Sequence, residues 1–210
     1  MDEPEPSRVE SDALIFTPRA EMCLDFANTL AYRGSAPLES LHNFAELAKW
    51  CTDARVIPQS LGQKLSGWSE RHPKRVVEIF AEAIRLRELI YRIFHAHAAG
   101  TKPARTDLDA LNRELSKTPA RVAVAMSAES FGWEVEDAKP SVELILAPVL
   151  WSAADLLIAP QRARLRECSN EKCLWLFLDD SKNGTRRWCS MQACGNRAKA
   201  HRHYLRHKGE

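Results

Sequence analysis

Apolar side chains recur every three or four positions over much of the first 160 residues, a period typical of amphipathic helices. The longest such segment spans residues 74–99 and ends before Gly100 and Pro103. Its core-facing stripe comprises Val76, Phe80, Ala83, Arg87, Ile90 and Phe94. The same rhythm predicts further helices at residues 21–30, 40–54 and 60–72, from Thr106 onward, and at 140–159, where the helix is kinked or restarts at Pro148.

A period of two residues marks the expected strands. Residues 14–16 form a short apolar run before Pro18. Residues 121–126 and 133–136 alternate apolar with small or charged side chains on either side of Gly132. Two alternating runs separated by a short connection predict a β-hairpin. We therefore expect a body that is mostly α-helical with a small hairpin or sheet, which is an α+β fold.

Composition and the lack of an export signal narrow the class of protein. Hydrophobic residues make up 45% of the chain and charged residues 28%, which is ordinary for a globular protein. The acidic first residues lack the basic and apolar regions of a secretory signal. The most apolar stretch, residues 144–159, is shorter than the roughly 20 residues that cross a bilayer. We expect a soluble, cytoplasmic protein with no membrane partner.

The formal net charge of +2 conceals an uneven distribution. Residues 161–210 contain 12 Lys and Arg against 5 Asp and Glu, a balance of +7, which leaves 18 basic and 23 acidic residues before them, a balance of −5. We divide the chain at this point into a body, residues 12–160, and a C-terminal module, residues 161–210. A basic module on an acidic body predicts contact with a polyanion such as a nucleic acid.

Four cysteines in the module form two identical pairs. Cys168 and Cys173 enclose four residues, Cys189 and Cys194 enclose four more, and fifteen residues separate the pairs. Thiolates in two such close pairs suit the tetrahedral coordination of Zn²⁺. We predict a structural zinc site with all four as ligands, which leaves no coordination position open for a catalytic water. The alternatives are a redox-active pair of dithiols or unligated core cysteines.

Two histidines and two further cysteines are less suited to this site. His201 and His203 are alternative ligands, but both lie one or two helical turns beyond Cys194. Cys23 and Cys51 lie in apolar helical surroundings without a nearby partner. We expect these two cysteines to be buried for packing alone.

The segments around the cysteines predict a small zinc finger. Residues 175–178 are apolar, Asn183 and Gly184 mark a turn, and residues 186–189 lead back, so we expect the two runs to pair as a hairpin. After Gly195, an Ala- and Arg-rich segment predicts a helix from about Asn196. We call each close cysteine pair a knuckle. A finger in which a knuckle, a hairpin, a second knuckle and a helix follow one another has a treble-clef-like outline.

The helix after the fourth cysteine divides into two faces at about 100° per residue. Ala198, His201 and Leu205 are expected to pack on the finger, which turns the basic side chains outward. With the arginines of the hairpin, the candidate DNA-binding residues are Arg186, Arg187, Arg197, Lys199, Arg202, His203 and Arg206. A basic helix that leaves a zinc knuckle can lie in a major groove, where Arg and Lys contact phosphates and guanine edges.

Alternatives to DNA binding stay open at this point. The cations can be no more than a solvated face at the end of a chain. The module can also bind another protein, or pack on the body as part of a scaffold, with Trp175 and Phe177 as the contact. The sequence leaves a homodimer open as well.

Arg87 places a cation in the middle of the apolar stripe, where a guanidinium needs a carboxylate or an anionic ligand. Asp25, between Leu24 and Phe26, is a carboxylate in similarly apolar company. One interpretation is that Asp25, Asn28 and Arg87 line a pocket for a small polar ligand. The other is that Arg87 pairs with Asp25 or extends its charge to the edge of the body.

The sequence carries no motif that indicates catalysis. It has no Gly-rich phosphate loop, no HExxH motif and no nucleophile elbow. His95 and His97 are two positions apart on the long helix and therefore point to different faces. We expect no enzymatic activity and name no catalytic residue, with an enzyme acting in a body pocket as a third hypothesis.

The cysteine pairs and their neighbours resemble the CGNR zinc finger. The resemblance rests on Cys168-x4-Cys173-Leu174-Trp175-x-Phe177-x-Asp179-x-Ser181, on Arg186-Arg187-Trp188-Cys189-Ser190-Met191, and on Cys194-Gly195-Asn196-Arg197. In the body, residues 23–29 and Leu86-Arg87-Glu88 resemble motifs of the ABATE domain, which precedes this finger in a family of bacterial proteins.

The resemblance extends over essentially the whole chain. The family is described as stress-induced transcription regulators, which implies a finger that binds DNA and a body that senses a ligand. The turn at residues 182–185 is less basic here than in many relatives.

Overall fold

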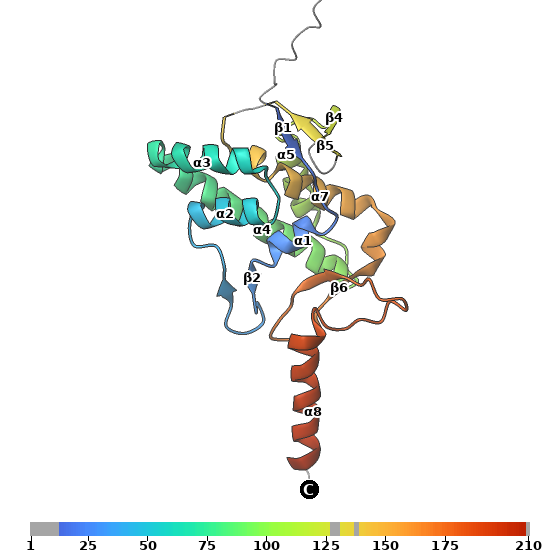
Figure 1. Ribbon diagram of the computed structural model, residues 1–210. Helices are drawn as coiled ribbons and strands as arrows, with labels where there is room; N and C mark the ends of the chain where they lie inside the picture. The colour runs from blue at the N-terminus through green and yellow to red at the C-terminus, as the bar shows by residue number, and fades with distance from the viewer. Residues whose placement is uncertain (1–12, 127–130, 137–138, 209–210) are drawn as a thin grey trace, which may run out of the picture.

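Short strands are interspersed among helices in the computed structural model, which describes residues 13–126, 131–136 and 139–208 (Figure 1). The first part of the chain contains β1 (Leu14–Phe16), α1 (Met22–Ala27), β2 (Leu30–Ala31), β3 (Leu38–Glu39), α2 (Phe44–Asp53), α3 (Gln59–Arg71), α4 (Pro73–Ala98), α5 (Arg105–Leu115), β4 (Ala123–Met126), β5 (Phe131–Val135), α6 (Val142–Ile145) and α7 (Ala147–Ile158). The C-terminal part contains the 3₁₀ turn η1 (Pro160–Arg164), β6 (Leu165–Glu167), β7 (Leu176–Leu178), the π turn η2 (Met191–Gly195) and α8 (Asn196–Lys208). The predicted α+β class is confirmed, and each helix predicted in the body is present.

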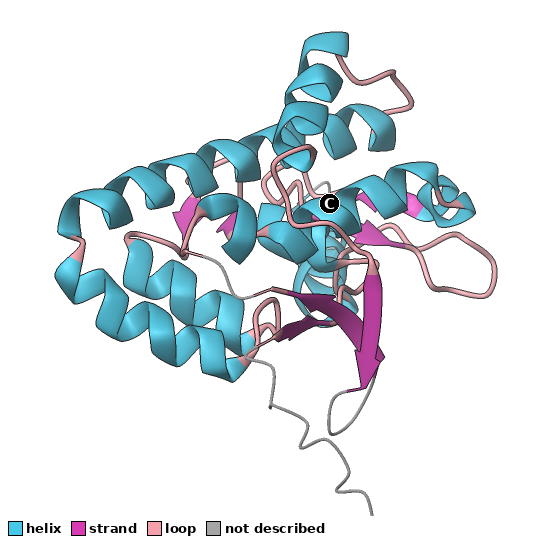
Figure 2. Ribbon diagram, turned by 90° about the horizontal axis from the view of Figure 1, so that it is seen from above, coloured by secondary structure: helices cyan, strands magenta, loops and turns pink. Residues whose placement is uncertain are grey.

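Helix α4 runs through the body, where α1, α2, α3, α5 and α6 contact it (Figures 1 and 2). Pro73 lies in its first turn, where the missing backbone N–H is not needed. Gly100 follows its end with a φ of +74°, a left-handed conformation that glycine adopts without strain. The strands β6 and β7 of the module also contact α4, so this helix joins the two parts of the chain.

The buried face of α4 is wider than the predicted stripe along the helix and is displaced from it at the beginning. Ile79, Leu86 and Ile93 are buried, although the stripe did not include them. Val76 and Phe80, which it did include, are only partly buried. The reason is an open groove that lies beside these two side chains between α4 and the neighbouring helices.

A three-stranded antiparallel sheet in the order β1-β5-β4 packs on α7. The predicted hairpin is confirmed as β4 and β5, and the predicted strand at residues 14–16 joins it at the β5 edge. Phe16 of β1 meets Trp151 of α7 edge to face, with 6.0 Å between the ring centroids. Aromatic contacts of this kind anchor a small sheet to a helix.

Strands β6 and β7 pair antiparallel and lie against the body. Leu165 and Leu176, one from each strand, are buried in the body core. The predicted pairing of residues 175–178 with residues 186–189 is therefore wrong, because β7 pairs with the segment that precedes Cys168. The first cysteine pair thus lies in the turn of the hairpin rather than before it.

Helix α8 projects away from the body (Figure 1). The prediction that Ala198, His201 and Leu205 pack on the finger is wrong for the last two. His201 is exposed and Leu205 leaves 54% of its surface accessible, whereas Ala198 is half-buried. Strands β6 and β7 pack against the body. They therefore cannot also cover α8, a 13-residue helix about 20 Å long.

Cys23 and Cys51 are fully buried, as predicted for cysteines that only pack. None of the helices in the described part of the chain is long and apolar enough to cross a membrane.

Candidate metal centre and basic helix

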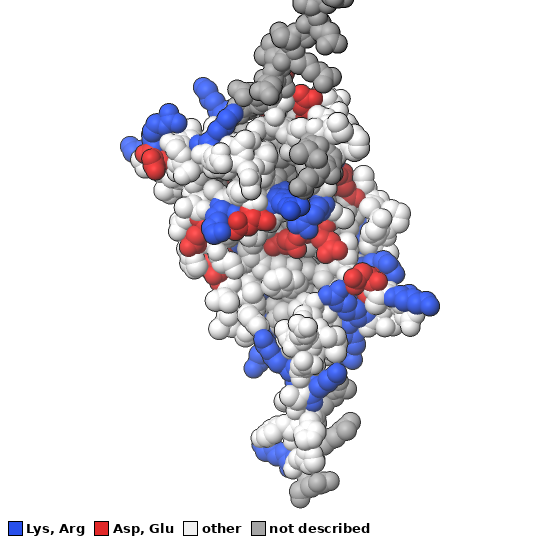
Figure 3. Space-filling model, viewed as in Figure 1, with Lys and Arg blue, Asp and Glu red and all other residues white. Residues whose placement is uncertain are grey.

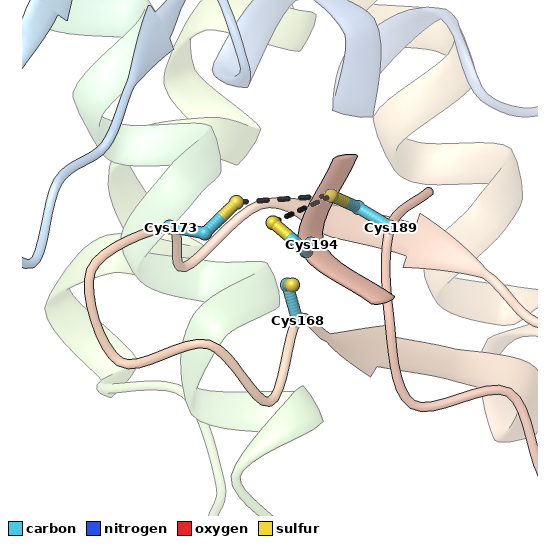
Figure 4. A group of neighbouring side chains, drawn as sticks. All are labelled: Cys168, Cys173, Cys189 and Cys194. Carbon is cyan, nitrogen blue, oxygen red and sulfur yellow. Dashed lines mark hydrogen bonds between the residues drawn. The ribbon is translucent and has the colours of Figure 1, made fainter. Parts of the chain in front are cut away.

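The four predicted zinc ligands come together in one cluster (Figure 4). The sulfur atoms of Cys168, Cys173, Cys189 and Cys194 all lie within 4.8 Å of one another. The Cys189 sulfur is 3.7 Å from that of Cys173 and 3.8 Å from that of Cys194. Metal–sulfur bonds of about 2.3 Å in a tetrahedron would separate the sulfurs by about 3.8 Å. The donor atoms and their spacing therefore fit a tetrahedral metal ion.

Four sulfurs this close cannot all be thiolates unless a cation balances them. Hydrogen bonds from the thiols of Cys173 and Cys189 lower the pKa of Cys168 to about 2. The contact with Cys168 raises the pKa of Cys173 to about 12, and contacts with both neighbours raise the pKa of Cys189. A divalent cation removes this conflict by stabilising every thiolate, so metal binding at this site must release protons.

The first knuckle is the connection between β6 and β7. The Cys173 N–H donates to the Asn170 carbonyl (2.7 Å), which closes a tight turn, and the Asn170 amide reaches the Cys194 sulfur (3.4 Å). Leu174 follows with a φ of +56°, a left-handed conformation that a residue with a Cβ rarely adopts. This bend directs the chain into β7, so the first two ligands and the strand are one local structure.

The second knuckle leads directly into α8. The Ser190 hydroxyl accepts a hydrogen bond from the Ala193 N–H (3.3 Å), and the Ser190 carbonyl accepts one from the Gly195 N–H (3.0 Å). These bonds form η2, which holds Cys194 two residues before Asn196, the first residue of the helix. The fourth ligand therefore sets where α8 begins.

Asp179 is a buried carboxylate that no sequence prediction assigned to the site. It accepts hydrogen bonds from the Ser181 hydroxyl (2.5 Å), the Ser181 N–H (3.0 Å) and the Arg186 N–H (3.0 Å). These bonds, the Ser181 hydroxyl foremost, lower the pKa of Asp179. The carboxylate thus closes the loop between the knuckles, and its Asp-x-Ser spacing was the signal that could have identified it.

Arg186 braces the second knuckle from inside the finger. Its guanidinium donates to the carbonyls of Trp188 (3.0 Å) and Cys189. It also pairs with Asp180 (3.0 Å) and lies over the Phe177 ring at 4.6 Å. Because its donors and one of its faces have protein partners, we no longer expect Arg186 to contact DNA.

Three of the other basic candidates have exposed side chains on the second knuckle and α8. Arg187, Lys199 and His203 are exposed. The backbone of Arg202 and Arg206 belongs to α8, but the side chains of both lie outside the described part of the structure. The prediction of DNA contact therefore stays open for these five residues.

Arg197, the second residue of α8, differs from the other basic candidates on the helix. Arg197 donates to the Tyr32 hydroxyl of the body (2.7 Å), so the first turn of the helix is tied to the body. His201 and His203, the alternative metal ligands, are exposed on the helix. The cluster found among the described residues consists of the four cysteines without them.

Arg87 has its charge balanced by the protein rather than by a ligand. Its side chain is 3% exposed and donates to both oxygens of Glu39 (2.6 and 2.8 Å) and to Glu88 (2.9 Å). Asp25 pairs with Arg19 instead (3.1 Å), so the predicted Arg87–Asp25 pair is wrong. The interpretation that Asp25 and Arg87 share a ligand pocket has thereby lost the unpaired charge on which it rested.

The carboxylates of this network are held ionised. Burial alone would raise the pKa of Glu39, but the hydrogen bond and charge of Arg87 hold it below its ordinary value. Burial likewise opposes the charge of Glu88, and the guanidinium groups of Arg33 and Arg87 together lower its pKa. Glu39 and Glu88 therefore fix β3 and the loop before it to helix α4.

Asn28 joins the body to the module. It is 5% exposed, its amide donates to the Leu176 carbonyl (2.8 Å), and its amide oxygen accepts from the Leu176 N–H (3.0 Å). Through these two hydrogen bonds, Asn28 of the body holds β7 along the edge that does not pair with β6. It also assigns Asn28 a structural role in place of the predicted contact with a ligand.

We expect Asn28→Ala to lower the free energy of unfolding by about 1–3 kcal/mol, because it leaves both backbone groups of Leu176 without partners. Urea unfolding followed by circular dichroism measures the change. Asn112→Ala, at an exposed helix position, is the matched control and should have little effect. Equal stability of the two variants would contradict the role assigned to Asn28.

A helical body that ends in a four-cysteine, metal-binding finger is the class of protein that this arrangement defines. Residues 20–160 match the family model ABATE, described as "Putative stress-induced transcription regulator", and residues 164–207 match the CGNR zinc finger. Because the first match covers more than half of the chain, the protein belongs to the ABATE family, with a CGNR zinc finger at its C-terminal end. The resemblance inferred from the sequence is confirmed. A search of curated proteins finds no match.

Proposed function

We propose that this protein is a transcription regulator whose cysteine cluster binds Zn²⁺ and presents α8 to the major groove of duplex DNA. The observation that carries the proposal is the exposure of α8, which extends from the metal centre and contains no acidic residue. Figure 3 shows blue side chains but no red ones along this helix, whereas both colours mix over the body. The family description as a transcription regulator supports the same conclusion.

The dimensions of α8 suit this partner. A helix is about 10–12 Å across with its side chains, and the major groove of B-DNA is about 12 Å wide. Because α8 is exposed on most of its circumference, it can enter the groove without a clash from the body. Arg187 at the knuckle and Lys199 on the helix would then meet phosphates on the rim of the groove.

The identity of the ion as Zn²⁺ rests on the donor set. Four thiolates in a tetrahedron are the ligands of structural zinc and leave no open position for a substrate. We therefore propose a structural metal and a protein without enzymatic activity, acting in the reducing cytoplasm where such thiols stay unoxidised. The proposal does not extend to a small ligand, because the residues that suggested one have protein partners.

The alternative is that the finger binds another protein. Trp175 has 36% of its surface exposed beside an apolar cleft of about 260 Å³ lined in part by Ala31 and Ala193. Phe177, the other predicted contact, is only 5% exposed and lies beneath Arg186, so it cannot join that surface. Trp175→Ala separates the two functions, since we expect DNA binding to survive it.

Salt dependence tests the DNA proposal. We expect the affinity for a fluorescent duplex to fall by about 10³-fold or more between about 50 and about 200 mM salt, as several phosphate contacts release counterions. Arg187→Ala with Lys199→Ala should weaken binding and reduce the logarithmic salt slope by about two, because each phosphate contact contributes about one. Arg202→Ala with Arg206→Ala should act in the same direction.

The control is Arg105→Ala, which removes a body arginine whose side chain is 94% exposed. It should leave both the affinity and the salt slope unchanged. Absence of duplex binding at low salt would contradict the proposal. Binding that survives all four module substitutions unchanged would contradict it equally.

A further inference from the structure

We propose that the β2–β3 loop, residues 32–37, fixes the direction of α8 relative to the body, with Tyr32 and Gly34 as positioning residues for DNA binding. The loop belongs to the body, yet it contacts both the first zinc knuckle and the first turn of α8. The inference rests on the proposed DNA-binding function for its consequence, but its geometry can be tested without DNA.

Gly34 seats the first knuckle on the body. A Cβ at this position would lie 1.7 Å from the Glu171 carbonyl oxygen and 2.9 Å from the carbonyl carbon. Both atoms are backbone and cannot rotate away, so any side chain at residue 34 must push the knuckle off the loop. The neighbouring Ser35 hydroxyl donates to the Lys172 carbonyl (3.4 Å), which holds the next residue of the same knuckle.

Tyr32 holds the other end of the module. Its hydroxyl accepts the hydrogen bond from Arg197 (2.7 Å), whose guanidinium also lies 5.3 Å from the centre of the Tyr32 ring. Arg197 is the second residue of α8, so this contact acts on the start of the helix. Tyr32 has a φ of +55°, a strained backbone conformation for a residue other than glycine. Such strain persists only where the surrounding contacts enforce it, and it is concentrated at functional sites.

The loop itself is braced against α4 by charged side chains. Arg33 lies between Tyr32 and Gly34 and pairs with Glu88 through two bonds (2.6 and 3.1 Å). Its guanidinium also donates to the Ala27 carbonyl (3.0 Å) at the end of α1. At the far end of the loop, the Arg87–Glu39 pair holds β3 to the same helix. The loop is therefore a fixed bracket rather than a mobile surface segment.

The two body segments that resemble family motifs meet at this bracket. Residues 23–29 contribute Asn28, which holds β7, and Thr29, whose hydroxyl accepts from Arg87 (3.3 Å). The motif on α4 contributes Arg87 and Glu88, which hold β3 and the β2–β3 loop through Glu39 and Arg33. The residues of both motifs therefore hold the finger on the body, either directly or through the β2–β3 loop. Together with the loop, they hold the module at β7, at the first knuckle and at the first turn of α8, in addition to the packing of β6 on the body.

A fixed mounting matters for DNA binding because α8 has little other support. A helix whose direction is set before binding loses less conformational freedom when it enters a groove. It also places the basic side chains of the second knuckle and of α8 opposite neighbouring phosphates at the same time. Loosening the bracket should therefore weaken DNA binding even though no DNA-contacting side chain and no metal ligand has changed.

The test compares Gly34→Ala with Gly67→Ala, whose added Cβ would meet nothing within 4 Å. Nitroxide-bearing amino acids at Ala81 on α4 and Ala200 on α8, both exposed, report the distance between body and helix by pulsed electron paramagnetic resonance. We expect one narrow distance distribution in the parent protein and in Gly67→Ala, and a broad or shifted one in Gly34→Ala. We also expect Gly34→Ala to keep its zinc and bind duplex about tenfold more weakly.

Tyr32→Phe provides a second variant that leaves the knuckle contact intact. Loss of its hydroxyl should broaden the distance distribution and weaken duplex binding by about threefold. This variant decides the matter if Gly34→Ala loses its zinc. A narrow, unshifted distribution in both variants, or in Tyr32→Phe where Gly34→Ala has lost zinc, would overturn the inference. If the parent protein binds no duplex, the proposed function fails, and the distance distributions still decide whether the loop directs α8.

Discussion

Removing the metal should unfold the second knuckle and α8 while most of the body stays folded. Structural zinc sites in small fingers contribute about 10–16 kcal/mol of apparent binding free energy. Without the ion, the few apolar side chains around the sulfurs form a cluster too small to maintain a fold. Strands β6 and β7 should remain in place, because Leu165 and Leu176 belong to the body core.

Cys194→Ser tests this expectation without a chelator. We expect it to lose the metal, to become sensitive to proteolysis from about residue 180 onward, and to retain most of its helical circular dichroism. Cys51→Ser is the matched control, since Cys51 is fully buried in the body and away from the metal centre. It should lower the stability of the body but keep the metal. Full metal content together with a protected α8 in Cys194→Ser would contradict the role given to the cluster.

Arg87→Met should lower the free energy of unfolding by about 3 kcal/mol, because it leaves the Glu39 carboxylate without its cation at the edge of the core. Arg85→Met is the matched control on the same helix, with a side chain that is 69% exposed. It should change the stability by less than about 0.5 kcal/mol. Adding Glu39→Gln to Arg87→Met should restore part of the loss. Urea unfolding measures all three, and equal effects of the two single substitutions would exclude a structural role for Arg87.

The same network predicts the direction of the acid sensitivity. Glu39 and Glu88 have pKa values below the ordinary 4.5 in the folded protein. The unfolded chain therefore takes up protons more readily, so this stabilisation is present above about pH 4.5 and is lost as the pH falls through the folded-state pKa values. The parent protein should lose more stability between about pH 5 and about pH 3 than the Arg87→Met and Glu39→Gln double variant. Parallel stability curves would show that the network is not coupled to folding.

Sequence reasoning identified the features that depend on local patterns. Cysteine spacing predicted the metal cluster, and the helical period predicted the body helices, because each signal is contained in a short stretch of chain. The alternation at β4 and β5 predicted their hairpin for the same reason. The faces of α8 could not be predicted in this way, since its amphipathic pattern is weak and the finger is too small to cover it.

Contacts between distant segments were beyond local patterns. Arg87 was correctly singled out as a buried charge, but its partner Glu39 lies 48 positions away in a two-residue strand. Asn28 was singled out too, yet its partner is the backbone of Leu176, 148 positions away, and a backbone group carries no side-chain signal. Strand β6 was missed because only Leu165 among its three residues is apolar.

The central claim is that a zinc centre presents α8 to DNA, and one titration tests it most directly. Fluorescence anisotropy of a labelled duplex at about 50 mM salt is measured with the zinc-loaded protein, the same protein after chelation, and the same protein reloaded with zinc. We expect duplex binding that is present in the loaded protein, lost after chelation and restored by zinc. Binding that is equally strong in the stripped protein, or absent from the loaded one, would contradict it.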